Sequence, residues 1–423
     1  MAKEQIKTKK RFRIWKVIGL TFLLMISSVV GGGVGYLKYL QSTMNQSIGE
    51  ETFDKKKIVK NKGVQEKEEY WTVALFGLDA RDATLGKGNR SDSIMIATLN
   101  KATKEVILTS IYRDSFVEIP GYGYDKLTHA YAFGGPELAI NTLNYNFDLD
   151  IQDYVTVNFA VTEKIINQLG GVEVDVKSDE VKWLNGYVRS LAREGADTRV
   201  EFIDGPGRQV LTGSQAVAYA RIRYTDGGDY KRAKRQRTIL NATFEKAKDA
   251  DLLQLNDIIK TMFAHINTNL SVQDILLLVK DINKYEIKDS QGFPYHTKNA
   301  RVNTCSYTEQ KIAVDIPTML AEDLKTLHYH LYGVGSPSTV KGLSDSYLGE
   351  DNGIANKGNG GEEEERLEGM TTEVVGEETT EEEVPSTTET VDVPVDPDKQ
   401  YTPSADVQRI SDYLSSQVEY LGY

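Results

Sequence analysis

The residues best suited to chemistry form a basic cluster preceded by a glycine pair. Five of the seven residues from Lys231 to Arg237 are basic, and Gly227, Gly228 and Asp229 stand just before them. Such a cluster in a globular region needs an anion to balance it. Because Gly-Gly-Asp is typical of a turn that opens a helix, we expect the anion at that helix N-terminus, where backbone amides and the dipole favour negative charge.

We predict that Asp229 is the N-cap of this helix. Arg232 then occupies the third helical position, and Gln236 lies one turn later on the same face. Arg221 and Arg223 come shortly before the glycine pair. Guanidinium groups are planar, stay charged at any relevant pH and match phosphate oxygens bidentately. The cluster therefore favours a phosphate ligand.

Three predicted strands carry charged residues of the same two types at their ends. The strands are Trp71–Leu78, Ser93–Leu99 and Glu105–Ile111. If they form an antiparallel meander, the end of the first, the start of the second and the end of the third lie at one edge of the sheet. Each of these positions has an arginine and an aspartate, namely Asp79 with Arg81, Arg90 with Asp92, and Arg113 with Asp114. One such pair is an ordinary solvated strand end, whereas three at one edge indicate a site.

The aspartates at this edge predict a metal ion. Two nearby carboxylates, Asp79 and Asp92, repel each other unless a cation lies between them, and oxygen ligands favour a hard ion such as Mg²⁺ or Mn²⁺. Mg²⁺ usually bridges one or two carboxylates to substrate phosphates. The arginines outnumber the carboxylates that they would have to balance. Two carboxylates that can bind a metal ion, together with more arginines than these carboxylates need, therefore indicate a pyrophosphate ligand.

Strands and helices are mixed along the middle of the chain. Further predicted strands are Tyr154–Phe159 and Val172–Val176, and the predicted helices are Pro136–Asn146, Val161–Leu169, Gly213–Ala220, Asp229–Ala247 and Ser271–Asn283. Thr212 and Gln215 have the spacing of a capping box at the third of these helices. This pattern predicts an α/β fold in which helices cover a mixed central sheet, within a domain of residues 70–333.

The N-terminal segment predicts a membrane anchor. Val17–Leu37 is a run of 21 residues without charge, long enough to cross the hydrocarbon core, and residues 1–16 are strongly basic. The positive-inside rule then keeps residues 1–16 in the cytoplasm and puts the linker 38–69 and the domain outside. A cleaved signal peptide is the alternative, but the run is long for one and no A-x-A-like site follows.

Composition separates the C-terminal segment from the domain. Residues 361–400 carry 15 Asp and Glu against two bases, a net charge of −13, so that the rest of the −12 chain is +1. We expect residues 334–402 to be a disordered acidic tail. Residues 403–423 have the pattern of a short amphipathic helix that docks on a partner or on the domain. Cys305 is the only cysteine, so no intrachain disulfide is expected, which fits a Gram-positive cell surface.

These motifs resemble the LytR-CpsA-Psr family. They occur in the family's order, as Gly77-Leu78-Asp79-Ala80-Arg81, Arg90-Ser91-Asp92, Ser110-Ile111-Tyr112-Arg113-Asp114, Lys126-Leu127-Thr128-His129-Ala130-Tyr131 (where the family has His or Asn at the fourth position), Leu169-Gly170-Gly171-Val172, Leu211 to Arg223, and Gly228 to Gln236. Tyr112 stands where the family usually has proline, which alters local stiffness. The resemblance spans most of Tyr70–Leu240 and does not include residues 361–423.

The resemblance implies a phosphotransferase at the outer face of the membrane. Such enzymes move a teichoic acid or capsular polysaccharide from polyprenyl pyrophosphate to peptidoglycan through a phosphodiester, with the lipid tail in an apolar groove. It implies Asp79 and Asp92 as metal ligands and Asp229 as the residue that orders the loop. The residues expected at the pyrophosphate are Arg81, Arg90, Arg113, Lys126, Arg221, Arg223, Asp229, Arg232 and Gln236, and those expected to act in catalysis are Arg113, Asp114, Arg221 and Arg223. For Asp114 we favour an ion pair with an arginine over the role of general base.

Other functions are consistent with part of this pattern. A hydrolase of lipid pyrophosphates would use the same arginines with water as acceptor, and a surface scaffold would use none of them. A DNA-bound attenuator would use the basic cluster, but the predicted topology puts that cluster outside the cell, so no nucleic-acid partner is expected. Membrane lipid is an expected contact, and a second copy of the chain or other cell-wall proteins stay open as partners.

Overall fold

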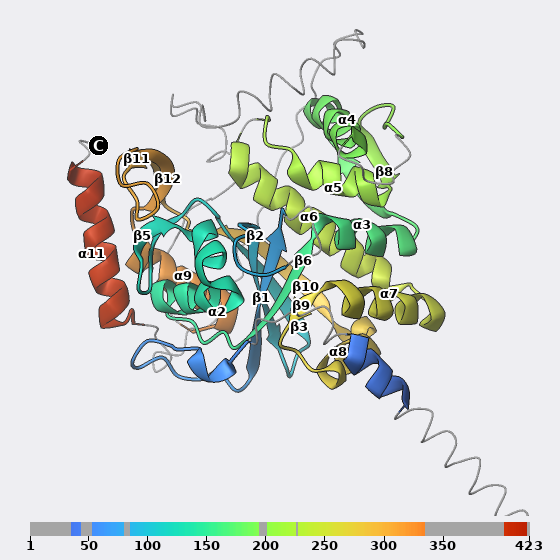
Figure 1. Ribbon diagram of the computed structural model, residues 1–423, viewed down its shortest axis with the longest axis horizontal. Coiled ribbons are helices and arrows are strands. Elements are labelled where there is room, and N and C mark those ends of the chain that lie inside the picture. Colours follow the sequence, from blue (N-terminus) through green and yellow to red (C-terminus); the bar gives the residue numbers. More distant parts are fainter. Residues whose placement is uncertain are drawn as a thin grey trace, which may run out of the picture.

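A six-stranded mixed sheet runs through the centre of the computed structural model (Figure 1). The structure describes residues 35–43, 53–79, 85–193, 201–225, 227–334 and 402–420. The strand order is β10-β3-β2-β1-β6-β9, in which β10 pairs with β3 and β1 with β6 in parallel. The strands are β1 (Tyr70–Leu78), β2 (Ser91–Asn100), β3 (Glu105–Ile111), β6 (Asp153–Asn158), β9 (Asn267–Thr268) and β10 (Glu286–Phe293).

The first three strands form the predicted antiparallel meander. Leu78 at the end of β1 pairs with Ser91 at the start of β2, and Met95 of β2 pairs with Ser110 near the end of β3. The three strand ends that carry Asp79, Asp92 and Arg113 therefore lie at one edge of the sheet, as expected. The mixed α/β fold predicted from the sequence is confirmed.

Helices cover both faces of the sheet. Ala74 and Phe76 of β1 belong to a core with α2 (Leu127–Phe147) and α9 (Leu320–Tyr332). Because side chains alternate along a strand, Trp71 points to the other face. There it packs with Val155 against a cluster from α7 (Leu252–His265) and α8 (Val272–Lys280). The helix that carries the basic cluster, α6 (Gly228–Lys248), lies against β3 and β10.

A second core lies beyond the sheet. It is formed by α3 (Phe159–Gln168), α4 (Ser178–Arg193), α5 (Gly213–Arg221) and the hairpin of β7 (Val172–Val176) and β8 (Gly207–Leu211). The predicted capping box of α5 is present, with Thr212 and Gln215 bonded reciprocally. The remaining elements are the 3₁₀ helices η1 (Lys55–Lys57) and η2 (Ile282–Lys284), and the strands β4 (Phe116–Ile119), β5 (Gly123–Lys126), β11 (Thr297–Val302) and β12 (Ile312–Pro317).

The helix α2 begins earlier than the sequence indicates. The prediction starts it at Pro136, because proline favours the first helical position. The structure starts it at Leu127 and carries it across a kink at Gly134 and Gly135, whose backbone angles are not helical. This additional N-terminal part brings the start of α2 to the site, next to Lys126.

The N-terminal segment packs on the domain where it is described. Residues 35–43 are helical, and fully buried Leu40 packs against Ile259 and Phe263 of α7. Tyr36 Oη donates a hydrogen bond to Asn256 Oδ1. The predicted membrane span 17–37 lies almost wholly outside the described residues. Within those residues, no helix is both long enough and apolar enough to span a bilayer.

The C-terminal helix α11 (Ala405–Tyr420) packs against α2, α9 and β12 (Figure 1, red). Val407, Ile410 and Leu414 are fully buried in the same core as the sheet. The sequence left open whether this segment docks on a partner or on the domain, and in the structure it docks on the domain. The helix α11 nevertheless lies outside the predicted domain limits, residues 70–333. The predicted acidic tail lies, except for its two end residues, outside the described residues.

Candidate active site

A β-bulge positions Asp92. Gly77 pairs with Ser93 and Leu78 pairs with Ser91, so Asp92 is an extra residue in β2. In a regular strand, alternation would place Asp92 on the face of Ile94, in the core with α2. Bulges next to active sites commonly redirect a side chain in this way. Asp92 instead meets the arginines at the edge of the sheet.

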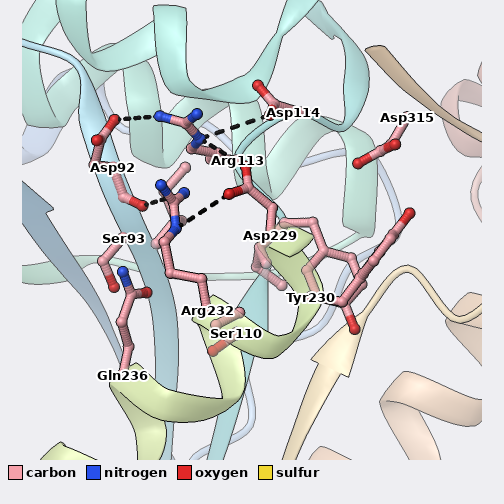
Figure 2. Close-up of a pocket in the computed structure, with 14 residues that line it drawn as sticks. Asp92, Ser93, Ser110, Arg113, Asp114, Asp229, Tyr230, Arg232, Gln236 and Asp315 are labelled. Atoms are coloured by element: carbon pink, nitrogen blue, oxygen red, sulfur yellow. Dashed lines mark hydrogen bonds and ion pairs between the residues drawn. The ribbon is translucent and has the colours of Figure 1, made fainter. Parts of the chain in front are cut away.

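Arg113 is the centre of the site (Figure 2). Its Nη1 lies 2.7 Å from Asp92 Oδ1, and its Nε lies 3.1 Å from Asp229 Oδ2 and 3.6 Å from Asp114 Oδ2. Its side chain is 19% exposed, so most of it is shielded from solvent. One guanidinium thus joins β2, the loop after β3 and the first turn of α6.

Two more arginines complete the cluster. Arg223 Nη2 lies 3.3 Å from Asp92 Oδ2, and Arg223 Nε lies 3.7 Å from Asp229 Oδ1. Arg232 Nη2 donates to the backbone oxygen of Asp92 at 3.2 Å, and its Nε is 3.3 Å from Asp229 Oδ1. Gln236 lines a pocket together with Asp92, Arg113, Asp229 and Arg232 (Figure 2).

The prediction that Asp229 is the N-cap of α6 is wrong. Gly227 is the N-cap, with a φ of 82°, and Asp229 is the second residue of the helix. Gly227 and Gly228, with φ of 82° and 44°, both have a positive φ that favours glycine. Arg232 is therefore the fifth helical residue rather than the third. The two side chains still meet, because their i,i+3 spacing puts them on one face.

Burial and charge act in opposite directions on the acids of the cluster. Burial alone would raise the pKa of Asp92 and of Asp229, but Arg113, Arg223 and Arg232 outweigh it and hold both pKa values below the ordinary range. Burial and the neighbouring Arg113 lower the pKa of Arg232 to about 10, despite Asp229. At neutral pH both acids are ionised, and Arg113 and Arg232 are charged.

The other predicted residues lie around this cluster. Lys126 Nζ is 2.9 Å from Asp114 Oδ1, which places Lys126 in the site. Asp79 follows β1 with its side chain 45% exposed, 3.9 Å from Arg221 Nη2. Arg90 Nη2 donates to Tyr307 Oη at 3.3 Å. Arg81 lies outside the described residues.

Sequence reasoning missed Asp315, which lines the pocket with Arg113 and Asp229. Burial, with the charge of Asp114, raises the pKa of the Asp315 carboxyl to about 7. Asn299 Nδ2 donates to its Oδ1 at 3.2 Å. Asp315 is the one acid in the otherwise apolar strand β12, and this exception was the only sequence feature that could have marked it as a functional residue. Nothing in its own neighbourhood in the sequence links it to residues some 80 positions earlier.

Tyr112, which stands where the resembled family usually has proline, makes two contacts beside the site. Its backbone N–H donates to Phe293 O at 2.9 Å, a hydrogen bond that proline cannot make. Its ring packs edge-on against Tyr230, the neighbour of Asp229, with centroids 4.5 Å apart. Through this ring contact with Tyr230, Tyr112 packs against the first turn of α6.

Within the described residues, no group of three or more His, Cys, Asp or Glu side chains could hold a metal ion, so the Mg²⁺ or Mn²⁺ site stays a prediction that rests on two carboxylates, Asp79 and Asp92. Each lies one residue from the paired Leu78 and Ser91, on neighbouring strands, and each offers hard carboxylate oxygens. Mg²⁺ takes one or two protein carboxylates and completes its shell with phosphate oxygens and water. The arginines beside the pair are suited to hold that phosphate.

The chain belongs to the LytR-CpsA-Psr family, because the LytR_cpsA_psr family model matches residues 36–320. It is 31% identical to the polyisoprenyl-teichoic acid–peptidoglycan teichoic acid transferase TagT of Bacillus subtilis, over 75% of this chain and 97% of the relative. It is 32% identical to the transferase TagU of Enterococcus faecalis, over 65% of this chain and 84% of the relative.

A solved structure has the same fold. The protein gbs0355 from Streptococcus agalactiae aligns with a TM-score of 0.52 and 22% identity, over 62% of this chain and 88% of that one. At this identity the likeness concerns the fold alone. The family match ends at residue 320, so α11 lies outside the matched region.

Proposed function

We propose that this protein is a phosphotransferase that moves a glycopolymer, a teichoic acid or capsular polysaccharide, from polyprenyl pyrophosphate to peptidoglycan. Its relatives TagT and TagU are named as transferases from polyisoprenyl-linked teichoic acid to peptidoglycan, and the match includes nearly the whole of TagT. The family and the charge pattern of the site support the same class of donor.

The observation that carries this proposal is the convergence of three arginines on two aspartates. Arg113, Arg223 and Arg232 come from three separate parts of the chain and all lie within 3.7 Å of Asp92 or Asp229. Three guanidinium groups at one point, of which Arg232 is buried and Arg113 and Arg223 are partly buried, are costly for a purely structural role, because burying a charge costs free energy. Planar, permanently charged forks at one point are the arrangement that a diphosphate requires.

The proposed phosphoryl transfer requires mainly that the substrates are held in position and that the charge of the transition state is stabilised. Phosphoryl transfer proceeds with little covalent help from protein, and charge stabilisation supplies most of the acceleration. Arg113 and Arg223 would hold the diphosphate, while Asp229 keeps both guanidiniums in place. Asp79 and Asp92 would hold Mg²⁺ or Mn²⁺, which neutralises charge on the phosphate oxygens when bound. The acceptor hydroxyl forms a P–O bond to the phosphorus that bears the polymer and gives up its proton to solvent, while the bond from that phosphorus to the bridging oxygen breaks and polyprenyl phosphate leaves.

We also propose that residues 17–37 anchor the chain in the cell membrane, with the catalytic domain outside. The helix of residues 35–43 continues this segment and packs on α7. At the start of α7, Leu252 is 84% and Leu253 is 77% exposed. These leucines lie four and three residues before Asn256, which accepts the hydrogen bond from Tyr36 next to the proposed anchor. Exposed apolar side chains at this place are suited to contact the membrane surface.

Cysteine labelling in intact cells tests this topology. Glu309 is exposed, and Glu309→Cys in a Cys305→Ser background supplies one accessible thiol. A membrane-impermeant maleimide should label it without lysis, whereas Lys9→Cys should react only after lysis. Labelling of Cys at position 309 that requires lysis would put the domain in the cytosol and reject the proposal.

A reconstituted transfer assay tests the activity. The full chain in detergent is given a polyprenyl-pyrophosphate oligosaccharide, Mg²⁺ and peptidoglycan oligomers, and sugar bound to peptidoglycan is measured beside free sugar phosphate. We expect bound product from the wild type and none from Asp92→Ala. Free sugar phosphate alone would indicate a hydrolase, and equal product from both proteins would show that this site does not carry the reaction.

A further inference from the structure

Beside the arginine cluster lies a buried Asp–His pair that the proposed mechanism does not use. Asp125 is fully buried at the end of β5, and its Oδ1 accepts a hydrogen bond from His129 Nδ1 at 2.8 Å. A carboxylate at Nδ1 fixes the proton on that nitrogen and leaves Nε2 as an acceptor. Nε2 makes no hydrogen bond to any of the described residues.

The second oxygen of Asp125 holds the loop between β11 and β12. Its Oδ2 accepts from the Ser306 backbone at 3.0 Å, from the Ser306 hydroxyl and from Cys305 Sγ at 3.2 Å. Burial would raise the pKa of Asp125, but the hydrogen bonds from His129 and Ser306 hold it well below its usual range. The next residue of this loop is Tyr307, whose hydroxyl accepts from Arg90 Nη2.

Aromatic rings extend from this pair to the protein surface. Tyr122 is 53% exposed and stacks on Phe133, with centroids 4.8 Å apart and an interplanar angle of 19°. His129 lies 5.9 Å from Phe133 and 6.2 Å from Tyr307 by ring centroid. We call Tyr122, Phe133, His129 and Tyr307 the aromatic strip. It begins at an exposed ring and ends at Arg90, a residue expected at the pyrophosphate.

We propose that the aromatic strip is the subsite for the acceptor sugar. Apolar C–H faces of a pyranose pack on aromatic rings, as Tyr122 and Phe133 offer them, while His129 Nε2 accepts a hydrogen bond from a sugar hydroxyl. The inference rests on the proposed transfer to a peptidoglycan glycan. It adds where the acceptor binds and which side chains recognise it.

The position of the strip supports an acceptor rather than a donor role. Lys126 joins Asp114 in the arginine cluster and stands three residues before His129, so β5 and the start of α2 connect the two places. The strip contains no lysine, arginine or acid, and Asp125 behind it is enclosed by its hydrogen bonds. A diphosphate needs cations, whereas a sugar needs rings and hydrogen-bond acceptors.

A purely structural role explains less of this arrangement. A histidine that only satisfies Asp125 does not require an exposed stacked pair of rings beside it. Asparagine at position 129 would offer the same two atoms as His129, an N–H to Asp125 and a second atom that accepts a hydrogen bond. Both residues therefore suit the task of orienting a hydroxyl, which does not need a strong base.

Acceptor kinetics of the full chain test the proposal. Tyr122→Ala should raise the KM for peptidoglycan oligomers about 10-fold, the loss of one ring contact. The KM for the lipid donor should not change. The control is Phe202→Ala, because Phe202 is an aromatic residue of similar exposure, 41%, near α4. It should leave both KM values unchanged.

Position 129 gives an independent arm of the test. His129→Asn keeps a donor to Asp125 and an acceptor, so its acceptor KM should stay within a few-fold of wild type, while His129→Ala should raise it at least as much as Tyr122→Ala. A normal acceptor KM in both alanine variants would overturn the inference. If a position-129 variant does not fold, Tyr122→Ala decides. A wild type that transfers nothing to peptidoglycan would instead refute the proposed function.

Discussion

Arg113 holds Asp92 with one side of its guanidinium, at 2.7 Å, and Asp229 with the other, at 3.1 Å. The two aspartates are 137 positions apart, one in a bulge of β2 and one in the first turn of α6. Burial would lower the pKa of Arg113, but Asp114, Asp229 and Asp92 raise it above its ordinary value. Arg113 is therefore both a structural bridge and a candidate ligand of the diphosphate.

Arg113→Ala should lower stability as well as activity. The change leaves two largely buried carboxylates without a shared partner, which costs about 3 kcal/mol. We expect a clear fall in Tm and loss of transfer in the reconstituted assay. An unchanged Tm, measured by calorimetry, would show that Arg113 is not the bridge described.

Arg223→Ala should abolish transfer while the domain stays folded. Its side chain is 32% exposed and its ion pairs are longer, so its loss should cost about 1 kcal/mol or less. Transfer should fall by at least about 100-fold, because a charge that stabilises the transition state is removed. Wild-type turnover by the folded variant would argue against a role for Arg223 at the diphosphate.

Gly77→Ala should disturb the bulge that directs Asp92. A Cβ at this position would lie 2.9 Å from Ser93 Cβ, so β2 must shift beside Asp92. We expect a loss of about 1–3 kcal/mol in stability and a larger relative loss in transfer. Gly205→Ala is the matched control, because a Cβ there meets no atom within 4 Å. Equal activity of the two variants would contradict the role given to the bulge.

Asp315→Asn should change how stability depends on pH. The pKa of Asp315 is raised to about 7, so its contribution is present in acid and is lost as pH rises through that value. Between pH 5 and pH 8 the variant should gain about 2 kcal/mol relative to wild type. Thermal melts at the two pH values measure this change, with exposed Asp257→Asn as control. The same difference at both pH values would mean that Asp315 is not protonated in the folded state.

The helix α11 should contribute to the stability of the domain. Leu414 is fully buried, and Leu414→Ala should cost about 3 kcal/mol. Removing residues 402–423 should lower Tm further, since it exposes the core beneath Val407 and Ile410. A deletion of residues 361–400 that keeps α11 should leave Tm near the wild-type value. An equal Tm for the two deletions would show that α11 does not support the fold.

Much of the site could be predicted because strand ends are local features of the sequence. The strand Glu105–Ile111 is predicted with its observed limits, and the short turn before it favours its antiparallel pairing with β2, whereas the pairing of β1 with β2 was assumed. These local patterns are sufficient to place Arg113 and Asp92 at one edge of the sheet. The family motifs add Arg223 and Arg232 from a more distant part of the chain.

The rest depends on contacts that periodicity does not encode. The bulge at Asp92 is a matter of register between two strands, and a one-residue offset leaves no mark in either run. Asp315, far along the chain, reaches the pocket because its backbone N–H donates to Asp114 O at 2.9 Å and it forms a parallel bridge with Ser115. The amphipathic pattern of residues 403–423 predicts a helix, but it cannot say which surface its apolar side contacts.

A crystal structure with a polyprenyl pyrophosphate and Mg²⁺ tests the central claim most directly. The account predicts diphosphate oxygens within hydrogen-bond distance of Arg113 and Arg223, with the metal between Asp79, Asp92 and the phosphates. A diphosphate bound elsewhere on the domain, with Arg113 and Arg223 still paired only to Asp92 and Asp229, would contradict it.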